Sequence, residues 1–538
     1  MSELVHQQIY RLFTMADTPK PPQGSHSISD TPETIFENVV AEKYPDAYEA
    51  SQVPEEVPAE VVSATDVDRP APQVLDEVPQ MPHDDGRIKY FFIGAVVLVF
   101  LIIFAALMVV FRRPSATTTA VVPVTLTYWG LWEDENILKP VFDAYIAENP
   151  HVKITYIKQS SKDYISFLKG RSKSGKGPDV FRYHNTWLPE LTNDESYVQP
   201  IPESIMTPAE FEKTFHLIHR QDLKKGDLYY GIPLYVDNLV MIYNKDILKA
   251  GGVAGPPRQW IGDLADVVSK VTVKNDTDVP VTSGIALGTA NNIEHFSDIY
   301  SVLLLLNNLT EQSSLSNEWA MGVLRNLSTQ QGADLASEAL QVYRQFGEEK
   351  IWSSKMPNSI DAFAQGKVAI IFAYTWQIPL IKAKNPEINL AVTSLPEGLQ
   401  GKKVTLASYW IEGVSPYAKA ANQAEAWKLL KYMSSAASEQ KIYEAQTKTR
   451  GLGMAYSRID LASKLSDHPI LSTVIGQLDQ SVSLPLVTRT FDKGLNDEMI
   501  TYLQKAVDST TGGVSYSGAM AEAITGFTQI LLKYKIDK

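Results

Sequence analysis

The sequence predicts an α/β protein whose folded body follows an acidic tail and a membrane-spanning helix. The body, from about residue 121, opens with a strand, a helix and a second strand. Residues 90–111 form a run of 22 residues without a charge, and residues 1–86 hold 17 Asp and Glu against 4 Lys and Arg. At 538 residues the chain is too long for one hydrophobic core, so we expect several folding units.

Residues 1–86 are predicted to be a disordered tail. They contain 11 of the 31 prolines and few apolar clusters, so they cannot bury enough surface to offset the entropy of ordering. The rest of the chain carries 45 acidic and 45 basic residues. A neutral body behind an acidic tail argues against nucleic acid as the main partner, because phosphate binding needs a basic surface.

A transmembrane helix is predicted at residues 88–112. Its apolar run, Tyr90–Phe111, is long enough to span the roughly 30 Å hydrocarbon core of a bilayer. Basic residues flank both ends equally (Arg87 and Lys89, Arg112 and Arg113), so charge alone does not orient the helix. Residues 113–120 then form a short Thr-rich linker.

Alternation and helical spacing predict the elements of the body. A strand at Val124–Trp129 is followed by a helix over residues 137–146, which ends at Asn149-Pro150, and by a strand at Val152–Tyr156. Short strands between longer helices indicate an α/β architecture with helix-covered sheets. Later helices are expected at Ile261–Val271, Ala333–Phe346, Ala424–Gln446 and Leu495–Val507.

Five segments, in order along the body, carry a family resemblance. They are Trp129–Trp132, Gly177–Phe181, Tyr229–Pro233 with Leu239–Asp246, Phe363–Ile371 with Trp376, and Ala424–Met433 with Arg450-Gly451. In this order and spacing they resemble the extracellular solute-binding proteins of ABC importers, family 1, which are maltose-binding-protein-like. The resemblance covers nearly all of the body and none of the first 120 residues.

The resemblance implies a periplasmic-binding-protein type II fold over residues 121–538, with two α/β lobes, a hinge and a ligand held between the lobes. The chain should cross between lobes near Tyr235–Asp237 and Leu395–Pro396, and return to the second lobe around residues 440–450. Because family members work outside the membrane, the body should be extracellular and the tail cytoplasmic. An anchoring transmembrane helix departs from the family, whose members are usually secreted or lipid-anchored.

A neutral sugar needs flat apolar surfaces for its rings and a few polar side chains for its hydroxyls. Several tryptophans lie at or just after predicted strand ends, where open α/β sheets bind ligands. The resemblance places Trp376 on the family's pocket tryptophan, and Trp132 is a secondary candidate. The alternative for each tryptophan is a place in the core, and for Glu133 an exposed helix start. The candidate ligand-binding residues are Trp129, Glu133, Asn185, Trp187, Tyr235, Asp237, Trp376, Trp410 and Arg450.

No catalytic residue, metal ligand or cofactor is expected. The chain has no cysteine, which removes thiolate metal sites and cysteine nucleophiles. Gly170–Lys176 resembles a phosphate-binding loop but has Gly177 where Ser or Thr would bind magnesium, and it lies between a helix and a strand. His216 and His219 lack a third ligand. Counting carboxylates does not exclude a glycosidase, although no segment resembles a barrel.

The function predicted from these observations is capture of a carbohydrate by a single-pass membrane protein for the permease subunits of an ABC transporter, and the expected ligand is an oligosaccharide. The alternative is a sensory receptor or scaffold that uses the same binding body while its tail engages a cytoplasmic partner. The tail is longer than anchoring requires, which favours the receptor, but no signalling domain is recognisable. The tryptophan count favours sugar over peptides or polyamines.

Overall fold

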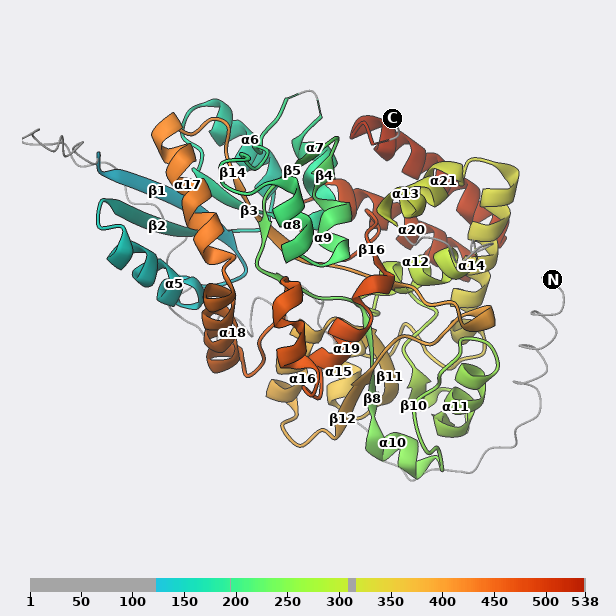
Figure 1. The fold of residues 1–538 in the computed structure, drawn as a ribbon. Helices are drawn as coiled ribbons and strands as arrows, with labels where there is room; N and C mark the ends of the chain where they lie inside the picture. The colour runs from blue at the N-terminus through green and yellow to red at the C-terminus, as the bar shows by residue number, and fades with distance from the viewer. Residues whose placement is uncertain (1–121, 194, 308–315, 537–538) are drawn as a thin grey trace, which may run out of the picture. The chain divides into compact units, whose positions relative to one another are not determined.

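The computed structural model describes residues 122–193, 195–307 and 316–536. The predicted tail (1–86), transmembrane helix (88–112) and linker (113–120) lie outside these residues. Among the described residues, no helix combines the length and the apolar character needed to cross a bilayer. The described chain contains two five-stranded sheets, each covered by its own helices, which we call lobe 1 and lobe 2 (Figure 1).

Lobe 1 is built on a sheet of order β2-β1-β3-β14-β6. Strands β1, β2 and β3 are parallel, whereas β14 runs antiparallel to β3 and β6. Helix α17 packs on β1, and α18 packs on α5 (Figure 1). The elements of lobe 1 are β1 (Val124–Leu131), α5 (Glu135–Glu148), β2 (Val152–Gln159), α6 (Tyr164–Lys173), β3 (Val180–His184), η1 (Asn185–Trp187), α7 (Leu188–Leu191), α8 (Pro208–Thr214), α9 (Leu217–Asp222), β4 (Lys224–Lys225), β5 (Leu228–Tyr229), β6 (Ile232–Pro233), β14 (Trp410–Val414), α17 (Ala420–Met433) and α18 (Ala436–Arg450).

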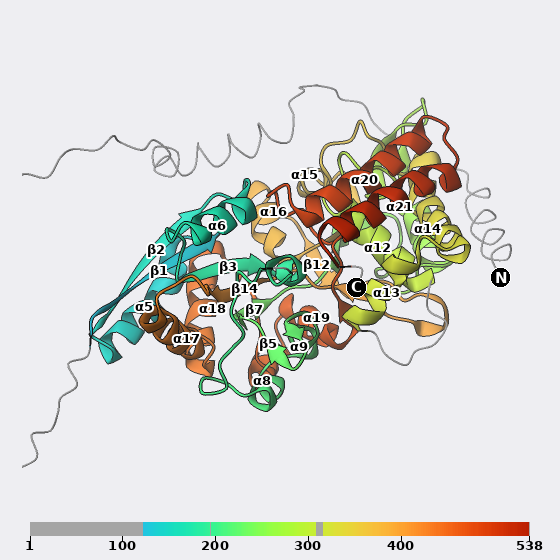
Figure 2. The same ribbon diagram turned by 90° about the horizontal axis from the view of Figure 1, so that it is seen from above.

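Lobe 2 is built on a sheet of order β12-β8-β11-β10-β9, in which β10 and β11 are parallel and β8 runs antiparallel to both of its neighbours. Helices α20 and α21 lie side by side and pack against α12 and α14 (Figure 2). The elements of lobe 2 are β8 (Val240–Asn244), α10 (Lys245–Ala250), α11 (Asp263–Val271), β9 (Val273–Lys274), β10 (Pro280–Ile285), α12 (Phe296–Asn307), α13 (Asn317–Asn326), α14 (Gln330–Glu348), α15 (Ser359–Ala364), β11 (Val368–Ala373), η2 (Thr375–Gln377), α16 (Ile378–Lys384), β12 (Leu390–Thr393), α20 (Leu495–Thr511) and α21 (Tyr516–Lys533).

Three segments cross between the lobes and carry short paired strands. The first joins β6 to β8, the second joins β12 to β14, and the third leads from α18 to α20. Strand β7 pairs with β15, β13 pairs with β16, and the Leu239 amide donates to the Leu406 carbonyl, so all three segments are hydrogen-bonded to one another. The remaining elements of these segments are β7 (Tyr235–Val236), η3 (Leu399–Gly401), β13 (Thr405–Leu406), β15 (Ala455–Tyr456), η4 (Ile459–Leu465), α19 (Leu471–Gly476), η5 (Leu478–Gln480) and β16 (Ser481–Val482).

The first two predicted crossings agree with the structure, since Tyr235–Asp237 lies between β6 and β8, and Leu395–Pro396 between β12 and β14. The third, expected around residues 440–450, is wrong. Helix α18 still belongs to lobe 1 there, because it packs on α5 and its Gln446 amide donates a 2.9 Å hydrogen bond to Glu133. The return to lobe 2 comes later, between β15 and α20.

The predicted elements are present, with one break. The helix expected at Ala424–Gln446 is two helices, because α17 ends at Met433 and Ser435 caps α18, which begins at Ala436. The Ser435 hydroxyl accepts a hydrogen bond from the Ser438 amide, a serine N-cap that sequence periodicity does not reveal. Strand β11 is buried at all six positions, which explains its uninterrupted apolar run, Val368–Ala373.

Candidate ligand-binding site

Two strand ends of lobe 1 place tryptophans beside each other. Trp132 directly follows β1, and Trp410 begins β14 opposite His184, the last residue of β3. Because β1 and β3 are parallel, their carboxyl ends meet at one edge of the sheet, where α/β sheets bind ligands. Trp132 is 42% exposed and has a left-handed backbone (φ 66°), which is uncommon outside glycine.

These tryptophans belong to an aromatic cluster, Trp132, Trp187, Trp410 and Phe491. The ring of Trp410 lies 6.1 Å from Trp132 and 5.4 Å from Trp187, which it meets edge-on. Trp187 is fully buried behind this surface, whereas Phe491, from the chain before α20, is 54% exposed and lies 6.3 Å from Trp132. The cluster therefore has a buried side in lobe 1 and an exposed side that includes a residue leading into lobe 2.

Lobe 2 contributes Trp376, which lies in η2 just after β11 and is 37% exposed. Its ring meets His295 edge-on at 6.4 Å. The carboxylate of Asp237, in the first crossing segment, accepts hydrogen bonds from the Thr375 hydroxyl (2.9 Å) and the Trp376 amide (3.2 Å). Asp237 is fully buried, so its carboxylate fixes the backbone of Trp376 to the first crossing segment.

A continuous set of contacts joins Trp376 to the aromatic cluster. The Asp237 carbonyl accepts from the Ser408 amide at 3.1 Å, and the Ser408 hydroxyl lies 3.1 Å from His184 Nε2. His184 in turn meets the ring of Trp410 edge-on at 5.1 Å. Burial lowers the pKa of His184 to about 3, so its imidazole is neutral. The two exposed tryptophan surfaces therefore border the same crossing segments.

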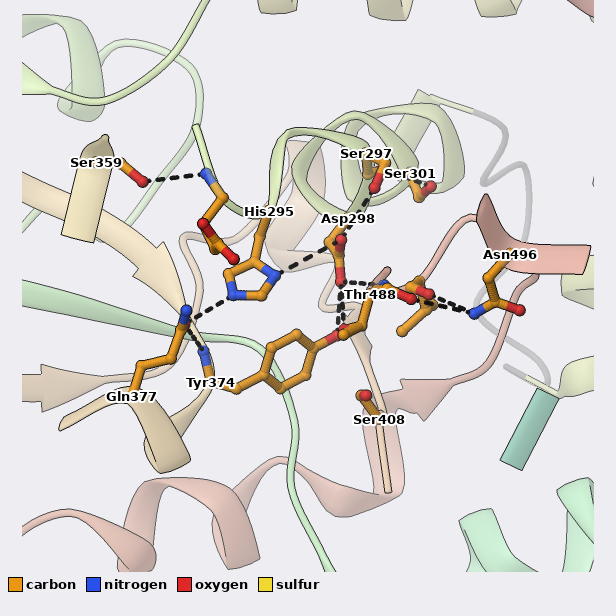
Figure 3. Close-up of polar contacts among 12 residues, drawn as sticks. His295, Ser297, Asp298, Ser301, Ser359, Tyr374, Gln377, Ser408, Thr488 and Asn496 are labelled. Carbon is orange, nitrogen blue, oxygen red and sulfur yellow. Dashed lines mark hydrogen bonds and ion pairs between the residues drawn. The ribbon is translucent and has the colours of Figure 1, made fainter. Parts of the chain in front are cut away.

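A second buried network supports the lobe 2 side of the site (Figure 3). One carboxylate oxygen of Asp298 accepts hydrogen bonds from the Tyr374 hydroxyl (2.7 Å) and the Thr488 amide (3.1 Å). His295 Nε2 lies 2.7 Å from Gln377, and its Nδ1 lies 3.9 Å from Asp298. Burial raises the pKa of Asp298. This network ties η2 to α12 and to the chain that leads to Phe491.

Glu133 and Arg450, both sequence candidates, belong to an ion-pair network. The guanidinium of Arg182, fully buried, donates to Glu133 (2.9 Å) and to Glu412 (2.7 Å), and Arg450 donates to Glu133 at 3.1 Å. Burial alone would raise the pKa of Glu133, but Arg182 and Arg450 hold that pKa below its usual value. Glu133 is therefore an ion-paired residue beneath Trp132 and not the exposed helix-start acid of the alternative interpretation.

Asn185 belongs to a third polar group, which joins lobe 1 to the crossing segments. One oxygen of the Asp222 carboxylate accepts three hydrogen bonds, from Tyr409 (2.6 Å), Ser483 (2.9 Å) and Asn185 (3.1 Å). Asn185 also donates to the Ser483 hydroxyl at 2.7 Å. Burial raises the pKa of Asp222 to about 7, although the three donors oppose that shift.

Replacing Asp222 with asparagine should remove a pH dependence of stability. Between pH about 4 and about 7 the folded chain holds a proton on Asp222 that the unfolded chain has released, so rising pH lowers the free energy of unfolding, by roughly 4 kcal/mol at most. An amide oxygen can accept all three hydrogen bonds without ionising. Thermal unfolding is measured from pH 4 to 8. The stability of Asp222→Asn relative to the wild type should rise up to pH about 7, and the difference in stability should stay constant above that pH. Parallel curves for the two proteins would contradict the raised pKa.

The remaining sequence candidates are buried. Trp129 is 4% exposed and stacks on Phe167, with ring centroids 5.3 Å apart. Tyr235 is 7% exposed, and its ring lies 5.8 Å from the Arg182 guanidinium. With Trp187 they form part of the core beneath the site, whereas Trp376 and Trp410 lie at its surface. No group of His, Asp and Glu suited to hold a metal ion occurs in the described part of the chain.

Sequence reasoning missed Phe491, Asp298 and His295. The sequence around Phe491 reads Thr488-Arg-Thr-Phe-Asp-Lys-Gly494, a polar stretch with one aromatic residue before a helix. An aromatic residue in a polar stretch is the one signal in the sequence that could have identified Phe491. It does not predict the contact with Trp132, because Trp132 lies far away along the chain. His295 lies directly before α12 and Asp298 in its first turn, and they carry no recognisable motif.

Two α/β lobes joined by three crossing segments, with aromatic surfaces where the segments meet, define a two-lobed binding protein. The profile of the bacterial extracellular solute-binding protein family matches residues 130–440. The chain belongs to this family, which is one of solute-binding proteins and not of enzymes. The family therefore confirms the resemblance described above and the absence of a catalytic role.

Among characterised relatives, the chain is similar to a multiple sugar-binding protein of Streptococcus mutans, with 23% identity over 62% of this chain and 76% of that protein. It is also 23% identical to a maltotriose-binding protein of Pyrococcus abyssi, over 55% of this chain and 59% of that protein.

Solved structures share the fold at low sequence identity. The sugar-binding protein MalE of Xanthomonas citri superposes with a TM-score of 0.60 and 17% identity, covering 77% of this chain and 98% of that one. A cyclo/maltodextrin-binding protein in complex with maltotetraose gives a TM-score of 0.56 and 16% identity, covering 76% and 97%. The two-lobed type II periplasmic-binding fold expected from the sequence is therefore confirmed for the body.

Proposed function

We propose that the body binds a carbohydrate, specifically an oligosaccharide, between its two lobes and presents it to the permease subunits of an ABC transporter. The observation that carries this proposal is the pair of exposed tryptophans, Trp132 and Trp376, which follow strand ends of different lobes and border the same crossing segments. Aromatic faces at such positions suit the apolar faces of sugar rings. The sugar ligands in the names of the relatives support the same ligand class.

The candidate residues divide into two roles in this proposal. Trp376 and Trp410 stack on the ligand together with Trp132, because their rings reach the surface. The buried candidates hold these rings in place: Asp237 positions Trp376, and Glu133 with Arg450 supports the turn that carries Trp132. The other buried candidates, in the core below, are Trp129, Asn185, Trp187 and Tyr235.

The proposal includes attachment to the membrane. The uncharged run Tyr90–Phe111 has the length and hydropathy of a transmembrane helix. With the body extracellular, as for the family, residues 1–86 would be cytoplasmic. This arrangement would hold the binding body next to the permease without a lipid anchor, and a cysteine-linked lipid is impossible in a chain without cysteine.

Substitution of Trp376 tests the ligand class. The full-length chain is titrated with maltotriose and a panel of other oligosaccharides while thermal unfolding and tryptophan fluorescence are followed. A sugar at a hundred times its Kd should raise the free energy of unfolding by about 2.7 kcal/mol. Loss of the stacking surface in Trp376→Ala should weaken binding about 10- to 100-fold.

The matched control is Trp319→Ala, because Trp319 is a partly buried tryptophan on α13, a helix that carries none of the candidate ligand-binding residues. This variant should keep the wild-type affinity. If the folded wild-type chain responds to no oligosaccharide, the ligand class is wrong. If the two tryptophan variants lose affinity equally, the site is wrong.

A further inference from the structure

The segment Thr488–Gly494, which we call the 488–494 loop, has an unusual backbone. Three of its residues other than glycine have positive φ angles: Thr488 (37°), Phe491 (58°) and Lys493 (59°). For such residues the left-handed region is sterically unfavourable, and it persists only where surrounding contacts enforce it. Conformations of this kind cluster at ligand clamps and switch regions.

Polar contacts enforce this conformation at the base of the loop. Asp298 accepts from the amide and hydroxyl of Thr488, and Asn496 donates to the carbonyls of Val487 (2.6 Å) and Thr488 (3.2 Å) (Figure 3). From lobe 1, the Thr186 hydroxyl donates to Asn496 at 2.8 Å. The base of the loop is therefore bonded to both lobes.

The tip of the loop is held by two carboxylates, one from α20 and one from the loop itself. Asp497, in the first turn of α20, accepts from the amides of Thr490 (3.1 Å), Phe491 (3.3 Å) and Lys493 (2.8 Å). Asp492 accepts from the Thr490 hydroxyl and the Gly494 amide. The tip is thus rigid before any ligand arrives, and a rigid element loses little entropy on binding.

The loop presents exposed side chains to lobe 1. Phe491, 54% exposed, meets Trp132 edge-on at an interplanar angle of 71°, and Lys493 lies 3.2 Å from Asp163 at the start of α6. Both members of the ion pair are more than half exposed, so that pair contributes little energy. The aromatic contact therefore dominates at the tip, and it joins two residues that each have a left-handed backbone.

We propose that the contact between Trp132 and Phe491 is an aromatic gate that closes one end of the oligosaccharide site and opens when the lobes move apart. The closed gate covers the terminal sugar ring, slows its release and limits the length of chain that the site accepts. The gate rests on the proposed function for its ligand. It adds to that function a residue, Phe491, that determines release rate and chain length.

Release kinetics test the gate in the full-length chain. Maltotriose and longer linear maltodextrins serve as probes, with tryptophan fluorescence followed in a stopped-flow instrument. Phe491→Ala should release the bound sugar about two- to tenfold faster, the size of one aromatic contact, with a smaller change in the association rate. It should also bind the longer chains better relative to maltotriose. The control, Leu399→Ala, removes a similarly exposed apolar side chain (50%) from η3 in the second crossing segment and should behave as wild type.

A second experiment needs no ligand, because the chain has no cysteine and introduced thiols are unique. The double variant Trp132→Cys/Phe491→Cys is treated with a short cross-linker that joins two thiols. It should react faster than the control pair Trp132→Cys/Leu399→Cys. Equal rates would show that the two positions do not meet and would overturn the gate.

The outcomes separate the gate from the function beneath it. Fast cross-linking with unchanged sugar release in Phe491→Ala would mean contact without gating and would overturn the proposal. If no saccharide binds the wild-type chain, the carbohydrate function fails and the sugar gate fails with it, while cross-linking still reports whether the lobes meet there. Fast cross-linking together with accelerated release supports both.

Discussion

Replacing Arg182 with leucine should destabilise the body by about 3–5 kcal/mol, because Glu412 would then be buried without its cation and Glu133 would keep only the partly exposed Arg450. The Arg182 side chain is fully buried and holds Glu133 from the β1 end and Glu412 from β14. It also donates to the Leu131 carbonyl at 3.2 Å, just before Trp132. The measurement is the thermal and denaturant unfolding of the full-length variant at neutral pH.

Two further variants separate the buried pairing from a general effect of charge. Arg450→Leu removes the other cation on Glu133, but the Arg450 side chain is 34% exposed, so its loss should cost much less. Adding Glu133→Gln and Glu412→Gln to Arg182→Leu should recover part of the lost stability, because the orphaned charges are then gone. A triple variant no more stable than Arg182→Leu would contradict the ion-pair explanation.

Replacing Asp237 with alanine should reduce both stability and ligand affinity. It removes the acceptors for the Thr375 hydroxyl and for the amides of Trp376 and Asn238, all at a buried position. Each buried donor left unpaired costs about 1–3 kcal/mol, so we expect a loss of several kcal/mol in the free energy of unfolding. Because Trp376 is positioned through this carboxylate, the ligand-induced rise in Tm should also shrink.

Comparison with asparagine at the same position sharpens this prediction. Both oxygens of Asp237 are used as acceptors, one by Asn238 and the other by Thr375 and Trp376. An asparagine amide has only one oxygen, so Asp237→Asn should remain clearly destabilising. Asp222→Asn, in contrast, keeps all three of its hydrogen bonds on one oxygen. If the two asparagine variants are equally stable at neutral pH, the proposed difference between these carboxylates is wrong.

Local pattern was sufficient to predict much of the fold. The strand-helix-strand opening appears as β1, α5 and β2, and the helices expected at 261–271, 333–346 and 495–507 are α11, α14 and α20 within a few residues. These elements are predictable because burial of one face imposes a period of two or 3.6 residues on the sequence. The ordered motifs also predicted the family and two of the three crossings.

The candidate site was predictable only in part. Trp376 and Trp410 lie at the surface, where a ligand can reach them, but Trp129 and Trp187, which the sequence pattern also places at strand ends, are buried. Which of these side chains faces out depends on what packs against it from distant segments, such as Phe167 over Trp129. Sequence alone therefore identified the edge of the sheet but not its exposed residues.

The sequence by itself determined the class of the chain: an α/β body with strand-end tryptophans, preceded by an acidic segment and an uncharged run. These properties depend on composition and on the spacing of residues close together in the chain, so they can be predicted without knowing which distant segments come into contact. The tertiary structure decided that Glu133 and Arg450 are ion-paired, that Asp237 positions Trp376, and that Phe491 meets Trp132. Each of these contacts joins residues more than a hundred positions apart, so it exists only because folding brings the two lobes and their crossing segments together.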